Sequence, residues 1–211
     1  MKHRQKRLGR FGLIIRSLNT FVHEIGHALM AIILGGSVES ISLNQNLSGV
    51  CKTKSKGRLR ASLVALSGYI FSALFSYWLI IFHDSRWAKL FVYFFIIMSI
   101  ISLIFWIKNK YGIIWTLSFL AINLALVLVP ELMPRFGGMI MLGFGIIIGL
   151  ENLGSTLALI RLSIISPKKA GDASNLSKNT RIPAFVWSLV FFGFSLWFSY
   201  LSFRVILAFF E

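Results

Sequence analysis

Five apolar runs, each close to the length of a membrane-spanning helix, constrain this chain more than any other feature. They cover roughly 61–82, 88–107, 111–129, 138–160 and 184–209, with polar or basic stretches between them. A helix needs about 20 mostly apolar residues to cross the ~30 Å hydrocarbon core of a bilayer. Each run is therefore predicted to be a transmembrane helix.

The composition excludes a water-soluble domain. The 211 residues are 56% hydrophobic, and their mean hydropathy is +0.77. We therefore predict an all-α polytopic membrane protein with about six helices, a single integral membrane domain over 1–211 in contact with the lipid bilayer.

The sixth helix is predicted from the stretch "NTFVHEIGHALMAIILGG", residues 19–36. Its apolar part, 21–34, would reach only about 21 Å at 1.5 Å per residue, which is short of a crossing. The organisation expected is a basic arm over 1–20, this helix over 21–36, a polar loop or hairpin over 37–60 and five helices over 61–211. The first helix either spans with a polar N-terminal half or re-enters from one side; both arrangements remain open.

Basic residues indicate the orientation. The loops 36–60, 108–110 and 161–182 hold 12 Lys and Arg, whereas 83–89 and 130–136 hold three. Cytoplasmic loops carry the excess of bases, so the side of residues 36–60 is predicted to be cytoplasmic. The formal charge of +15 is then explained by topology and lipid headgroups. Nucleic acid is not expected as a partner, because the basic clusters lack interleaved aromatic residues.

Residues 37–53, "SVESISLNQNLSGVCKT", are the one candidate β element. Two short alternating stretches flank a polar turn at residues 44–46, which is typical of a hairpin, although an ordinary polar connector fits equally well. An open hairpin edge could bind an extended peptide by strand addition.

The polar residues of the first helix have metalloprotease spacing. His23 and His27 are four residues apart, so they share a helix face and can bind one ion. Glu24 can act as the general base toward water activated by that ion. The alternative is a structural polar cluster. We favour metal chemistry, because polar groups in hydrocarbon cost several kcal/mol unless they are paired or coordinated.

The string "HEIGHALMAIILGGSVESISL" followed by "SGV" resembles the site-2 protease family of intramembrane zinc metalloproteases, in particular its small bacterial members. The resemblance extends to "LVALSGYIFSALF", a helix expected to pack against the site, and to "GDASNLSKNTRIPAFVW", which is similar to the segment that carries an aspartate in the family. It implies His23 and His27 as zinc ligands, Glu24 as the base and a later carboxylate as the third ligand. The family's Leu-Asp-Gly string is missing here.

The third ligand can be sought among the seven acids of the chain. Asp172 lies in a loop on the side of residues 36–60 and is favoured, partly through the family resemblance; its alternative role is to cap a short helix. Glu151, within an apolar run, is the competing ligand. Glu151 and its neighbour Asn152 could instead orient a ligand or pack helices together.

The sequence thus predicts an intramembrane zinc metalloprotease that hydrolyses a peptide bond in or near a transmembrane segment of a membrane-protein substrate. We expect a multi-pass protein of a bacterial cell membrane with its site toward the cytoplasmic face. Two alternatives remain: a membrane protein that binds zinc without proteolysis, and a small transporter that uses Glu151 and Asn152.

Overall fold

The computed structural model describes residues 2–209. Over these residues the chain forms helices and one two-stranded antiparallel sheet. The elements are, in chain order, α1 (Lys2–Ile33), β1 (Ser37–Leu43), β2 (Gly49–Lys54), α2 (Arg58–Ile81), α3 (Ser85–Ile101) with a π-helical turn η1 (Ser102–Trp106), α4 (Lys110–Leu128), α5 (Leu132–Ile165), a 3-10 turn η2 (Pro167–Lys169), α6 (Gly171–Thr180) and α7 (Ala184–Leu207).

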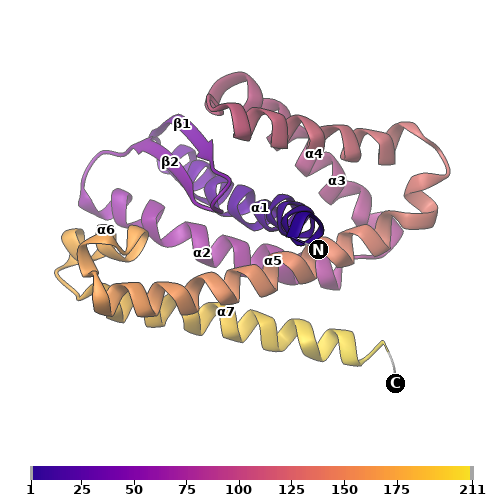
Figure 1. Cartoon of the computed structure of the whole chain (residues 1–211). Helices are drawn as coiled ribbons and strands as arrows, with labels where there is room; N and C mark the ends of the chain where they lie inside the picture. Colours follow the sequence, from indigo (N-terminus) through magenta and orange to yellow (C-terminus); the bar gives the residue numbers. More distant parts are fainter. Residues whose placement is uncertain (1, 210–211) are drawn as a thin grey trace.

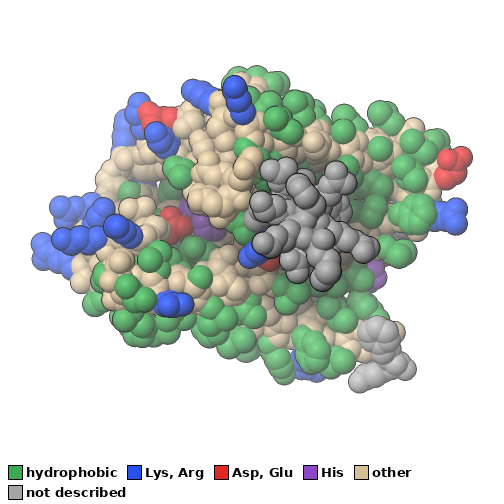
Figure 2. Space-filling model, viewed as in Figure 1, with side chains coloured by type: hydrophobic (Ala, Val, Ile, Leu, Met, Phe, Trp, Pro, Cys, Tyr) green, Lys and Arg blue, Asp and Glu red, His purple; other side chains and the backbone are tan. Residues whose placement is uncertain are grey.

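The five predicted membrane spans are confirmed. Five helices are long and apolar enough to cross a bilayer, namely α2, α3 with η1, α4, α5 and α7. Helices α2, α5 and α7 lie side by side, while α3 and α4 form a helical hairpin beyond α1 (Figure 1). Large apolar side chains on these five helices face outward, as lipid-facing residues do (Figure 2).

Helix α1 is longer than the sequence suggests. The segment expected as a basic arm, 1–20, continues the same helix from Lys2, because its Lys, Arg and Leu residues are good helix formers. The helix ends where Gly35 adopts a positive φ of 70°, a conformation that glycine reaches without steric cost. Midway along α1, Phe21 packs against Trp115 and Phe119 of α4, with ring centroids 5.5 and 6.0 Å apart.

The hairpin predicted over 37–53 is confirmed. Strands β1 and β2 pair in register from Leu43 opposite Gly49 to Ser37 opposite Lys54, with one irregularity near Val38. The outer edge of β1 is covered, since Ile41 bridges to Ile107 and the Asn109 side chain bonds both backbone groups of Leu43. The outer edge of β2 has no strand partner in the described part of the chain.

Helix α6 lies across one end of the bundle, near the start of α2 and α7 (Figure 1). A small apolar cluster anchors it there, built from Ala170, Ala173 and Leu176 on one side and Ala65, Leu159, Ala184 and Phe191 on the other. This anchoring holds the first turn of α6 beside His23 and His27 of α1.

Candidate metal centre

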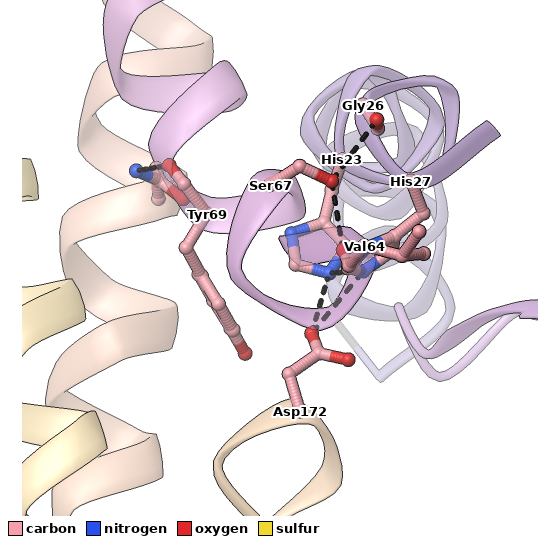
Figure 3. A network of polar contacts seen from close by, with 8 residues as sticks. His23, Gly26, His27, Val64, Ser67, Tyr69 and Asp172 are labelled. Carbon is pink, nitrogen blue, oxygen red and sulfur yellow. Dashed lines mark hydrogen bonds and ion pairs between the residues drawn. The ribbon is translucent and has the colours of Figure 1, made fainter. Parts of the chain in front are cut away.

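Three side chains from distant parts of the chain meet at one point (Figure 3). His23 and His27 lie one turn apart on α1, and their Nε2 atoms are 3.1 Å apart. The Oδ2 atom of Asp172, in the first turn of α6, lies 3.2 Å from each of these nitrogens. The arrangement is a nearly equilateral triangle of one oxygen and two nitrogen atoms.

This triangle fits a zinc ion. Ligand atoms about 2.0 Å from a tetrahedral ion are separated by about 3.3 Å, close to the distances found here. Imidazole nitrogen and carboxylate oxygen are ordinary zinc ligands, and three protein ligands leave a fourth position for water or substrate. The predicted residues His23, His27 and Asp172 are therefore brought together in a geometry that could hold the metal.

The orientation of His27 is fixed by its second nitrogen. Its Nδ1 atom lies 2.6 Å from the backbone oxygen of Val64 on α2. A carbonyl oxygen only accepts hydrogen bonds, so Nδ1 must carry the proton and donate it. In the neutral ring, the form that can bind a metal, the lone pair is thereby left on Nε2, the atom in the triangle.

Asp172 is turned toward the histidines and does not cap α6. The helix has no side-chain capping hydrogen bond at its start. Burial opposes ionisation of this carboxyl group, but the neighbouring His27 and His23 more than compensate and hold the pKa of Asp172 well below its usual range. Asp172 thus has the charge state that a metal ligand requires.

The close approach of α2 to the histidines depends on Gly68. A Cβ atom at this position would lie 2.5 Å from His27 Nε2 and 2.6 Å from His23 Cε1. Only a residue without a side chain lets the two helices come this close. The adjacent Ser67 donates a hydrogen bond to the backbone oxygen of Gly26 on α1, at 3.1 Å, which holds the crossing.

Glu24 lies between the histidines and the hairpin. It is 4% exposed, and its carboxylate rests against the Cα atom of Gly49 and within reach of the backbone N–H of Cys51. It lines the same cavity as His23 and Asp172. The carboxylate is therefore near the triangle without belonging to it, as expected for a general base.

Two adjoining cavities, of about 400 and 320 Å³, open onto the triangle. Both are lined by Cys51 and Asp172, and together they follow the outer edge of β2 from Leu47 to Ser55. In the space-filling view, histidine and acidic side chains are visible in a hollow between the hairpin and the bundle (Figure 2). An extended segment could therefore reach the triangle along β2.

The other two predicted site residues lie outside the triangle. Glu151 forms an ion pair with Arg16 of α1, at 2.8 Å. Asn152 donates hydrogen bonds to the backbone oxygen of Tyr69 at 3.2 Å and to Ser195 Oγ at 2.9 Å. Glu151 thus joins α5 to α1, while Asn152 joins α5 to α2 and α7 directly beside the site.

Sequence reasoning did not identify Tyr69 as a site residue. Its ring packs edge-on against that of His23, with centroids 4.5 Å apart, and it lines the larger cavity. The sequence did offer one indication of its role: Tyr69 follows Ser67 and Gly68 in a helix that was already expected to pack against the histidines.

One of the three comparisons with known proteins gave a match. A family model described as Peptidase M50B-like, a site-2 protease family, matches residues 7–202, which is nearly the whole chain and includes every candidate site residue named above. Comparison with curated proteins and with solved structures found no match.

Proposed function

The chain belongs to the Peptidase M50B-like family and is a membrane metalloprotease, and from this premise we propose that it hydrolyses a peptide bond in or beside a transmembrane segment of another membrane protein, using zinc. The observation that carries the proposal is the triangle of His23, His27 and Asp172 with Glu24 beside it. Ionisable groups inside a bundle of membrane helices cost stability, so this set is better explained by a catalytic role than by a structural one.

Each residue has a role in the reaction. The two histidines and Asp172 would hold zinc, which supplies a more acidic water and polarises the scissile carbonyl group. Glu24 accepts a proton from the water as its oxygen bonds to the carbonyl carbon. The same proton then passes to the amide nitrogen as the C–N bond breaks, which leaves a carboxyl group and an amine.

The outer edge of β2 is suited to hold the substrate. Its backbone groups have no strand partner within residues 2–209, and the cavities follow it past Cys51. A substrate segment in extended conformation would pair with this edge and present its backbone to the triangle. A transmembrane helix of the substrate must therefore unwind locally before it is cleaved.

The bases on the connecting segments support a cytoplasmic site. Asp172 belongs to the 161–182 connection, and β2 belongs to the 36–60 connection; these are the base-rich segments of the chain. We propose that the triangle opens toward the cytoplasmic face, in a bacterial cell membrane as the family resemblance suggests.

The alternatives have less support. A protein that binds zinc only for structure gives no reason for a buried carboxylate at Glu24 beside the metal ligands. A transporter path through Glu151 and Asn152 is disfavoured by their contacts, because Arg16 pairs with the former and Ser195 accepts from the latter.

The test is cleavage by the Glu24→Gln variant. Purified protein in detergent is incubated with a library of synthetic single-span transmembrane peptides, and products are identified by mass spectrometry. We expect the wild type to cleave and Glu24→Gln to lose at least ~100-fold in rate while keeping zinc, since only the base is lost. Glu131→Gln, an exposed glutamate between α4 and α5, is the matched control. Equal cleavage by Glu24→Gln and the control would refute proteolysis by this site.

A further inference from the structure

Tyr69 forms one wall of the site. It is in α2, directly after Gly68, and its ring stands edge-on to that of His23 (Figure 3). In this view the ring runs past the imidazole, so that its hydroxyl reaches the level of the Asp172 carboxylate. Both residues line the larger cavity. The hydroxyl is therefore a proton donor at the edge of the candidate metal centre.

Contacts on three sides hold Tyr69 in place. Its ring lies between those of His23 and Phe191, with centroids 4.5 and 4.8 Å away. Its backbone oxygen accepts from Asn152, which is itself fixed by donating to Ser195. The hydroxyl, by contrast, has no hydrogen-bond partner among the residues that the structure describes. The donor is rigid in position and uncommitted.

Four other polar side chains on the larger cavity lack one of these two properties. Thr20 donates its hydroxyl to the backbone oxygen of Leu47, and Ser155 donates to its own helix. Lys169 and Asn175 are exposed, so each would lose side-chain freedom on binding. Electrostatic stabilisation is most effective when the donor is already oriented before the reaction begins.

We propose that Tyr69 is a further catalytic residue, which donates a hydrogen bond to the substrate carbonyl oxygen as that oxygen gains negative charge. This inference rests on the proposed proteolysis. Glu24 acts from the hairpin wall of the cavity, whereas Tyr69 acts from the wall formed by α2 and α7. The proton stays on the phenol of Tyr69 throughout. The hydrogen bond from this phenol to the carbonyl oxygen only becomes shorter as water adds to the carbonyl carbon.

The first test compares Tyr69→Phe with Tyr77→Phe. The Phe side chain keeps the ring contacts with His23 and removes only the donor. We expect kcat for the best-cleaved peptide of the library to fall about 100-fold, with zinc content kept and KM nearly unchanged, because the bond forms in the transition state. Tyr77 is on the same helix but packs against Phe198, so its variant should match the wild type. A Tyr69→Phe variant with wild-type kcat would overturn the proposal while leaving proteolysis intact.

A second test measures binding without turnover. N-phosphoryl-leucinamide carries a tetrahedral oxyanion of the kind that develops during hydrolysis, and calorimetry gives its affinity for the zinc-loaded protein. We expect Tyr69→Phe to bind it about 10-fold more weakly than the wild type and than Tyr77→Phe. Equal affinity for all three proteins, or no binding by the wild type, would contradict a donor at this position. Loss of proteolysis in Glu24→Gln is independent of this result, so the two proposals fail separately.

Discussion

Gly68→Ala should damage the metal centre although it replaces no metal ligand. The added Cβ atom would lie 2.5 Å from His27 Nε2 and 2.6 Å from His23 Cε1. Non-bonded heavy atoms prefer a separation of about 3.5 Å, so α2 or the two imidazoles must move by about 1 Å. Metal sites tolerate deviations of only about 0.2 Å in ligand distance.

The expected magnitude follows from this displacement. Changes that disturb the orientation of metal ligands typically cost 10- to 100-fold in metal affinity, and a ~1 Å misplacement costs about 100-fold in rate. We expect Gly68→Ala to lose zinc affinity by about 10- to 100-fold. Folding should be less affected, because alanine is favoured over glycine in a helix by ~1 kcal/mol, which offsets part of the crowding.

Zinc affinity is measured by competition with a chromophoric chelator, alongside thermal unfolding. Gly154→Ala is the matched control, since this glycine is also helical and a Cβ there would meet nothing within 4 Å. The control should bind zinc as the wild type does. If Gly68→Ala binds zinc as tightly as Gly154→Ala, then α2 does not press on the histidines and the described packing is wrong.

Three further experiments probe the surroundings of the site. Gly49→Ala would push its Cβ into the Glu24 carboxylate, so peptide cleavage should fall by at least ~10-fold while zinc is retained; loss of zinc would show instead that the hairpin supports the ligands. Burial raises the pKa of the Cys51 thiol from 9.0 to about 12. At pH 8, below both pKa values, iodoacetamide should therefore modify Cys51 of the folded protein, after treatment with a metal chelator, about 1000-fold more slowly than an ordinary thiol, because the reactive thiolate is scarcer by that factor. Rapid modification of Cys51 would contradict its burial. Lys178→Cys should be protected from an impermeant thiol reagent in intact cells and Arg86→Cys should react, whereas the reverse pattern would place the site on the outer face.

The sequence predicted the features that depend on local spacing. The apolar runs indicated the membrane helices, and the four-residue interval between His23 and His27 indicated a shared helix face. Asp172 was found differently, by elimination among seven acids and by the family resemblance. Its approach to the histidines depends on how α6 packs across the bundle, which no local pattern encodes.

The remaining contacts could not be predicted because they join helices far apart in the sequence. Glu151 was a candidate ligand as an acid within an apolar run, but the partner that it meets, Arg16, lies 135 positions away. Tyr69 likewise reads as an ordinary aromatic residue of a membrane helix. Its place beside His23 follows from the close crossing of α1 and α2, which glycine at position 68 permits.

The most direct test of the central claim is the zinc content of purified protein, measured by mass spectrometry for the wild type and four variants. The account predicts about one zinc ion per chain for the wild type, loss of zinc in His27→Ala and Asp172→Ala, and retention in Asp84→Ala, an exposed aspartate, and in Glu151→Gln. Zinc retained by Asp172→Ala but lost from Glu151→Gln would make the intramembrane glutamate the third ligand. Stoichiometric zinc in His27→Ala would contradict the metal centre altogether.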